Sequence, residues 1–73
     1  SGADGTRAEY WVEKGRILLD ERDPRRALRF LDEALARDPD YRAAWLYKGK
    51  ALEALSRHEE AARCFERADS RAG

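Results

Sequence analysis

His58 and Cys64 are the only histidine and the only cysteine in this chain of 73 residues, and their side chains are the best suited to nucleophilic catalysis or metal binding. They are six positions apart, which places them on different sides of a helix, and no third ligand converges on them. We interpret Cys64 as a small apolar residue and His58 as a packing or turn residue. A reactive thiol stays open as an alternative for Cys64 if the segment that carries it is uncovered. A lone cysteine forms no disulfide within the chain and suits a reducing compartment, so we expect a cytoplasmic location.

Four arginines form a second candidate site, because they recur at i, i+3, i+4 and i+7 between Arg22 and Arg29. Such a cluster could hold phosphate. However, Asp23, Asp32 and Glu33 lie within reach, and the 15 basic residues of the chain are balanced by 15 acidic ones. A nucleic-acid-binding domain is usually strongly basic. We therefore interpret the cluster as a solvated, self-paired face and keep a nucleic-acid contact as a minor alternative.

Other patterns that could do chemistry are weaker. Adjacent carboxylates such as Glu59 and Glu60 diverge on a helix, and nothing suggests a desolvated pocket around them. Gly15 and Gly49 are isolated, so there is no glycine-rich phosphate loop. We expect no enzymatic activity, no metal and no cofactor. No apolar run approaches the ~18 residues of a membrane span, so we expect no membrane partner.

Apolar residues recur at helical spacing in four segments, which short polar breaks separate. The inward positions are Ala8, Trp11, Val12, Gly15, Leu18 and Leu19 in the first segment, Ala27, Leu28, Phe30, Leu31, Ala34 and Leu35 in the second, Ala44, Trp45, Gly49, Leu52 and Leu55 in the third, and Ala61, Ala62, Phe65 and Ala68 in the fourth. No strand pattern appears. Because the breaks are short, neighbouring helices must pack antiparallel.

The breaks also predict where the helices begin and end. Thr6 and Asp23 are expected to cap the first two helices, which should end near Glu21 and Arg37. Asp40 should cap the third helix, and that helix should end near Ser56. A second capping box is expected at 56–59, before the fourth helix, which should fray from residue 70 onward.

The chain repeats itself at an offset of 34 residues. Trp11 and Gly15 recur as Trp45 and Gly49, and the same offset relates the residues in the pairs Leu18 and Leu52, Ala27 and Ala61, and Ala34 and Ala68. A fixed period of this length is typical of stacked helical repeats. Glycine inside a helix costs about 1 kcal/mol relative to alanine, so we expect another helix to approach closely at both glycines, and we expect the tryptophans to fill the gap at the other end of each hairpin.

These residues resemble the tetratricopeptide repeat family, whose pattern has a bulky residue, Leu-Gly and Tyr on the first helix, and Ala, Phe, Ala and Pro on the second. At the positions of this pattern the first repeat supplies Trp11, Gly15, Leu18, Ala27, Leu31, Ala34 and Pro39, and the second supplies Trp45, Gly49, Leu52, Ala61, Phe65 and Ala68. The chain departs from the pattern at Lys14 and Lys48, which replace leucine, and at Leu18 and Leu52, which replace tyrosine.

The resemblance implies an all-α fold, in which two antiparallel helix-turn-helix hairpins stack as a short right-handed α-solenoid. We assign residues 7–41 to the first repeat and residues 42–73 to the second. Residues 1–6 read as a flexible lead with a cloning remnant, so we expect the sequence to be a piece of a longer protein.

In this family the first helix of each repeat lines a concave groove that receives an extended peptide or a partner helix. By resemblance, the groove-facing residues are Glu9, Val12, Glu13, Arg16, Leu19, Asp20, Ala43, Leu46, Tyr47, Lys50 and Glu53. Tyr47 is the best anchor, because an aromatic ring with a polar tip suits a recognition surface. Simple solvation is the alternative for each of these positions.

One subclass of the family clamps the C-terminal carboxylate of chaperone tails, using Lys and Asn on the first helix, Asn in the second repeat, and a third repeat. The corresponding positions here are Val12, Arg16 and Tyr47, so we do not carry that function over. We expect a protein–protein interaction scaffold that binds a protein or peptide. The alternative is a structural fragment of a longer solenoid, which forms a homo-oligomer through its uncovered last helix by the inner sides of Leu55, Ala62 and Phe65.

Overall fold

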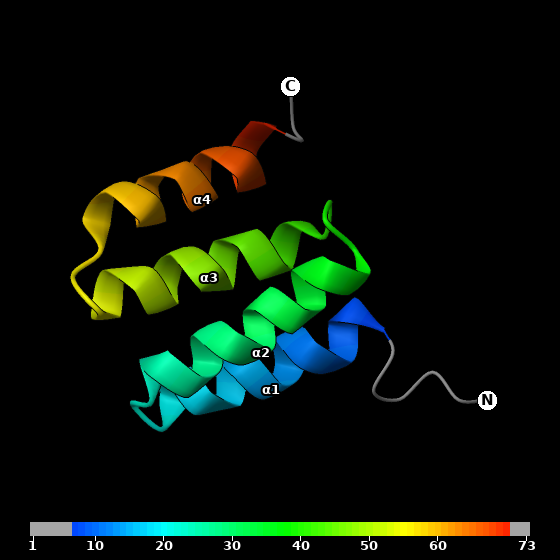
Figure 1. The fold of residues 1–73 in the computed structure, drawn as a ribbon, viewed down its shortest axis with the longest axis horizontal. Helices are drawn as coiled ribbons and strands as arrows, with labels where there is room; N and C mark the ends of the chain where they lie inside the picture. The colour runs from blue at the N-terminus through cyan, green and yellow to red at the C-terminus, as the bar shows by residue number, and fades with distance from the viewer. Residues whose placement is uncertain (1–6, 71–73) are drawn as a thin grey trace.

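The computed structural model describes residues 7–70, and this part of the chain forms four α-helices with no strand. They are α1 (Ala8–Asp20), α2 (Pro24–Arg37), α3 (Arg42–Ala54) and α4 (His58–Ser70). Consecutive helices run antiparallel, so α1 with α2 and α3 with α4 form two hairpins stacked one on the other (Figure 1). The predicted all-α fold of two stacked hairpins is confirmed. The expected flexible lead and the Thr6 cap lie outside the described residues.

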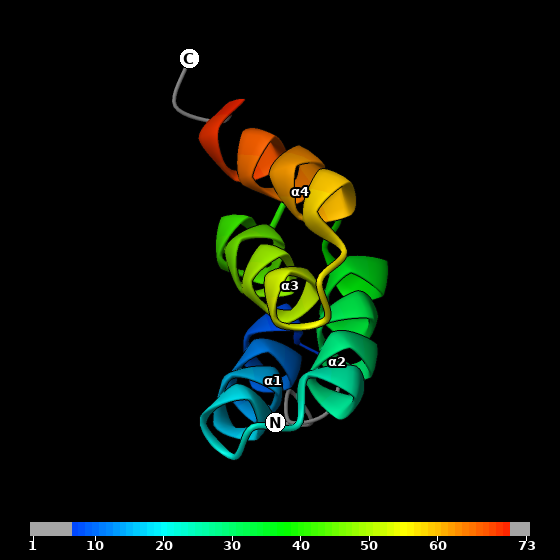
Figure 2. The same cartoon turned by 90° about the vertical axis from the view of Figure 1, so that its left-hand side faces the viewer.

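α1 and α3 lie on one side of the molecule, and α2 and α4 lie on the other (Figure 2). α3 contacts both helices of the first hairpin, whereas α4 packs on α3. The second hairpin therefore packs on the first hairpin through α3, which contacts both α1 and α2.

α1 and α3 end with the same backbone motif. Arg22 and Ser56 both have a φ of 63°, and the amide of the next residue donates to Leu18 O at 2.9 Å in the first hairpin and to Leu52 O at 2.8 Å in the second. This left-handed closure normally uses glycine. Ser56 therefore ends α3, and the capping box expected from that residue is wrong. Both helices also stop one or two residues before the predicted ends.

The starts of α2 and α3 differ. Asp23 caps α2 as predicted, since its side chain accepts from the amide of Arg26 at 3.3 Å. The N-cap of α3 is Tyr41, which makes no side-chain capping bond, so the prediction that Asp40 caps this helix is wrong. The amide of Asp40 instead donates to Asp38 Oδ1 at 3.1 Å, which forms a local turn.

Close approach at the two glycines holds each hairpin together. A Cβ on Gly15 would lie 2.8 Å from Leu31 Cγ, and a Cβ on Gly49 would lie 2.5 Å from Phe65 Cε1. Real Cβ atoms do not come so near to carbon, so only glycine permits the observed packing. The predicted close approach is confirmed at both positions.

The core is formed by small and medium-sized apolar residues. The buried hydrophobic residues are Ala8, Val12, Leu18, Ala27, Leu31, Ala34, Ala44, Ala51, Leu52, Ala61, Cys64 and Ala68. Cys64 is 4% exposed, which confirms its interpretation as a small apolar residue. Ala62 was predicted to face inward, but it is exposed, because α4 turns Ala61, Cys64 and Ala68 toward α3 and leaves Ala62 on its outer side.

The two tryptophans lie in different surroundings. The ring of Trp11 packs on Phe30 with centroids 5.6 Å apart. Trp45 donates its indole N–H to Pro39 O at 2.7 Å, and the guanidinium of Arg67 lies 4.5 Å from its ring centroid. The residue that replaces Phe30 in the second hairpin is Cys64, so Trp45 has no equivalent aromatic neighbour at that position.

Candidate functional site

The residues predicted to line a groove lie on α1 and α3, which share one side of the molecule (Figure 2). Eight of the residues predicted to contact a partner are exposed or half-buried, and we call them the α1–α3 surface. They are Glu9, Glu13, Arg16, Asp20, Leu46, Tyr47, Lys50 and Glu53. Leu19 and Ala43 are half-buried against the core.

Val12 does not belong to this surface. It is 6% exposed and lies in the core cluster, so its assignment to the groove is wrong. The reason is its position four residues after Ala8 and three before Gly15, which places it on their buried face of α1. The same side chain was also predicted to face inward, and that prediction is confirmed.

Arg16 lies at the centre of the α1 part of this surface. Its Nε donates to Glu13 Oε2 at 3.1 Å, and its Nη1 lies 3.5 Å from Asp20 Oδ2. The hydrogen bond from Arg16, helped by its charge, lowers the pKa of Glu13. The same bond raises the pKa of Arg16, to which the charges of Glu13 and Asp20 and the nearby Tyr47 of α3 also contribute. Tyr47 of α3 therefore lies near Arg16 of α1 on this surface.

The α3 part combines an exposed leucine with an aromatic ring. Leu46 is 40% exposed, whereas Tyr47 is half-buried against the core. The ammonium of Lys50 lies 5.5 Å from the centroid of the Tyr47 ring, within the range of a cation–π contact. An apolar side chain beside a fixed aromatic ring is what a partner residue can dock on.

His58 contacts Glu53, the last residue of the α1–α3 surface along α3. It is the first residue of α4, and its Nδ1 lies 2.7 Å from Glu53 Oε1. The side chain is exposed, so its interpretation as a packing residue is wrong, and its place at the start of α4 agrees with a turn position. The contact joins the end of α3 to the start of α4.

The charge of the α1–α3 surface is negative. Four carboxylates (Glu9, Glu13, Asp20 and Glu53) are set against two cations (Arg16 and Lys50), which leaves a formal excess of two negative charges. Arg16 is engaged by two of these carboxylates on its own helix. A partner therefore meets an acidic rim around an apolar and aromatic centre.

Comparison with known protein families agrees with this architecture, since the model for the tetratricopeptide repeat matches residues 12–73. The chain belongs to the tetratricopeptide repeat family. Tetratricopeptide repeats generally mediate protein–protein interactions and are typically not enzymes.

Over 59 residues this repeat pair is 41% identical to an uncharacterized protein of Methanocaldococcus jannaschii, in an alignment that covers 81% of this chain and 69% of the relative. No solved structure matches the chain. The family therefore establishes the repeat fold and its general role, and the choice of partner depends on the residues of this chain.

The thiol of Cys64 in this tetratricopeptide repeat pair lies in an apolar environment. Burial raises the pKa of Cys64, and Lys48 offsets only part of this effect. Between residues 7 and 70, no three His, Cys, Asp or Glu side chains gather in a way that could hold a metal ion. Within the same range, none of the helices has the length and apolarity that crossing a bilayer requires.

Proposed function

We propose that this tetratricopeptide repeat pair is a protein-interaction module that receives a peptide or partner helix on the α1–α3 surface. The observation that carries the proposal is the exposed Leu46 next to Tyr47, surrounded by charged side chains of both helices. Energetically important contact residues are typically aromatic or apolar and are surrounded by a polar rim. The free thiol of Cys64 further suits a reducing compartment such as the cytoplasm.

The charge of the surface indicates the chemistry of the partner. Glu13 and Asp20 neutralise Arg16, so the surface offers more carboxylates than free cations. Opposite charges speed encounter and exclude partners of the wrong sign. The partner is therefore a segment that carries lysine or arginine on either side of an apolar residue.

A displayed library of random peptides tests this proposal. Selection against the protein should enrich basic peptides with one or two apolar residues. Leu46→Ala and Tyr47→Ala should each weaken the binding of a selected peptide by about tenfold, the loss expected of a residue that carries much of the binding energy. Tyr10→Ala is the matched control, because Tyr10 is an exposed tyrosine of α1 that does not belong to the α1–α3 surface, and its loss should leave the affinity unchanged. Equal losses in all three variants would contradict the proposal.

Self-association through the outer face of α4 is the second candidate, and the composition of that face does not favour it. α2 packs its Leu28 and Leu35 against the core of the stack. The residues 34 positions later on α4 are Ala62 and Asp69, and both are exposed. An outer face of small and charged residues is typical of a helix that ends a stack, rather than of a hydrophobic interface.

One specific observation instead favours self-association through α1. Ala44 and Ala51 of α3 are fully buried against the first hairpin. The residues 34 positions earlier on α1 are Tyr10 and Ile17, which are 37% and 41% exposed. If the protein forms a homo-oligomer, this apolar face of α1 is where we place the contact. Light scattering across the micromolar range tests it: a dimer that Ile17→Lys converts to a monomer supports the contact, and a monomer at all concentrations contradicts it.

A further inference from the structure

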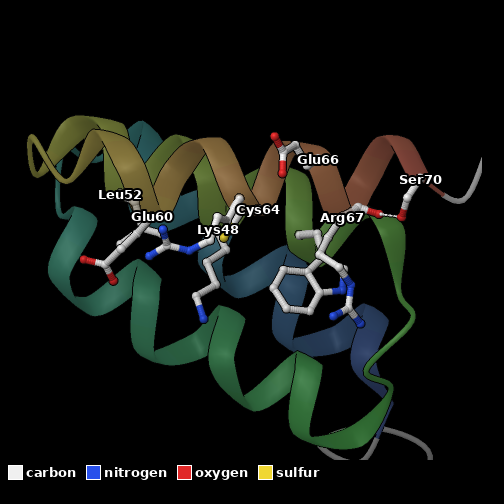
Figure 3. A pocket seen from close by; sticks show the side chains of 9 residues that line it. Lys48, Leu52, Glu60, Cys64, Glu66, Arg67 and Ser70 are labelled. Carbon is white, nitrogen blue, oxygen red and sulfur yellow. Dashed lines mark hydrogen bonds between the residues drawn. The ribbon is translucent and has the colours of Figure 1, made fainter.

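An open hollow of about 560 Å³ lies between α3 and α4, away from the α1–α3 surface. Trp45 and Leu52 of α3 and Cys64 of α4 form its apolar lining. Figure 3 shows the hollow from the side on which α4 and α2 lie in front of α3. It is a different site from the one proposed above, because none of its lining residues belongs to the α1–α3 surface.

The internal repeat explains why the second hairpin has this hollow. In the first hairpin, the ring of Phe30 packs on Trp11, with centroids 5.6 Å apart and planes at 59°. The residue at the same place in the second hairpin is Cys64, which is much smaller. Trp45 is therefore left without the ring that covers Trp11. The contact between Phe30 and Trp11 therefore indicates that an aromatic ring fits beside Trp45.

The charges around the hollow indicate what must accompany that ring. The ammonium of Lys48 lies 2.7 Å from Asp32 Oδ1, and Glu60 accepts two hydrogen bonds from Arg57 at 2.8 and 2.9 Å. Each of these four charged side chains therefore has a partner within the protein. Arg63, Glu66 and Arg67 of α4 are the other charged residues that line the hollow.

Arg63 and Arg67 line the hollow, and within residues 7–70 neither forms an ion pair. The guanidinium of Arg67 lies 4.5 Å from the ring centroid of Trp45, so its donors stand directly beside the apolar lining. In Figure 3 the side chain of Arg67 extends into the hollow. Glu66 also lines it, so three cations (Lys48, Arg63 and Arg67) stand there against two carboxylates (Glu60 and Glu66). The hollow therefore combines an apolar lining with a cationic rim.

We propose that this hollow binds a segment of a partner protein in which an acidic residue stands next to an aromatic residue. The aromatic ring packs on Trp45, in the place that Phe30 takes against Trp11. The carboxylate of its neighbour accepts hydrogen bonds from the guanidinium of Arg67, and Arg63 adds a second positive charge. Two different partners, or two parts of one partner, can then occupy the α1–α3 surface and the hollow at the same time.

Nuclear magnetic resonance with short peptides tests the proposal on the intact chain. The probes are acetyl-Asp-Phe-amide, its neutral analogue acetyl-Asn-Phe-amide, and acetyl-Asp-Ala-amide, which lacks the ring. We expect acetyl-Asp-Phe-amide to shift the indole N–H signal of Trp45 and not that of Trp11. We expect the other two peptides to bind at least about fivefold more weakly, since each lacks one of the two recognised groups.

Two variants make the test specific. Cys64→Phe should fill the hollow with a ring, as Phe30 does in the first hairpin, and abolish the shifts. Arg67→Gln changes an exposed side chain, so it keeps the fold while weakening acetyl-Asp-Phe-amide to the level of the Asn peptide. Equal binding of the Asp and Asn peptides, or unchanged binding by Arg67→Gln, would overturn the proposal. So would tighter binding of adenosine monophosphate, because the hollow would then be a nucleotide site.

Discussion

Gly49 lies so close to the ring of Phe65 that a Cβ at position 49 would stand 2.5 Å from Cε1 of the ring. The equivalent glycine of the first hairpin, Gly15, meets Leu31 in the same way. Each hairpin therefore depends on one point where the partner side chain occupies the space of a missing Cβ. The second contact also sets how closely α3 and α4, the two helices that form the hollow, approach each other.

Gly49→Ala should destabilise the protein by about 1–3 kcal/mol, because the added methyl group forces Phe65 out of its place. The better helix propensity of alanine, worth about 1 kcal/mol, opposes this loss and does not reverse it. Urea denaturation measures the free energy of unfolding. Ala62→Gly on the exposed side of α4 is the control, and it should cost about 1 kcal/mol from propensity alone. A Gly49→Ala variant more stable than the wild type would contradict the packing described.

Ser56→Gly should stabilise the protein by about 0.5–1 kcal/mol, because Ser56 has a φ of 63°, where glycine carries no Cβ penalty. Arg22→Gly should act in the same direction, since it has the same φ 34 residues earlier. Thermal unfolding monitored by circular dichroism provides the measurement. Ser56→Val is the control of opposite sign, because a β-branched residue is strained at positive φ. A lower melting temperature for Ser56→Gly would show that this turn is not left-handed in solution.

The carboxyl of Glu60 should titrate below its ordinary range, because hydrogen bonds from Arg57 lower the pKa of Glu60. A carboxyl whose pKa is lower in the folded state contributes stability above its unfolded pKa. That contribution is lost as the pH falls through the folded pKa. In an NMR titration, Arg57→Gln should raise the pKa of Glu60. Arg63→Gln, which removes only a nearby charge, should raise it less, and equal effects would argue against the hydrogen bonds.

The thiol of Cys64 should react with iodoacetamide at least about tenfold more slowly than a free cysteine at pH 8, because burial raises its pKa and restricts access. Denaturant should restore the ordinary rate. The double variant Ala62→Cys, Cys64→Ala is a matched control, since it moves the thiol to the exposed side of the same helix. Rapid modification of native Cys64 would instead support the reactive thiol that the sequence left open.

Most of the fold could be predicted from the sequence, because the 34-residue period and the polar breaks are local signals. Asp23 caps α2 as its position before proline predicts. Asp40 instead follows its proline, Pro39, and lies one residue before Tyr41, which is the N-cap of α3. The composition of a break does not determine its number of residues. Ala62 was predicted to be buried but is exposed. Alanine has too little apolar surface to determine which face of a helix is buried, so the other residues of α4 determine it.

The candidate surfaces were harder to predict than the helices. The groove pattern of the family included Val12, which is buried, because a family pattern places positions on a helix and does not report how deeply one chain buries them. The hollow beside Trp45 was missed entirely. Its signal was nevertheless present, since the repeat that pairs Trp11 with Trp45 also pairs Phe30 with Cys64. The difference in side-chain size between Phe30 and Cys64, at equivalent positions of the two repeats, predicts a hollow beside Trp45.

The most direct test of the proposed function is to add a saturating amount of a peptide selected from the random library to isotopically labelled protein and map the amide shifts. The account predicts that the largest shifts fall on exposed residues of α1 and α3, including Arg16, Leu46 and Tyr47, and that the outer face of α4 stays unchanged. Shifts concentrated on α4, with Leu46 and Tyr47 unaffected, would contradict the central claim that the α1–α3 surface receives the partner.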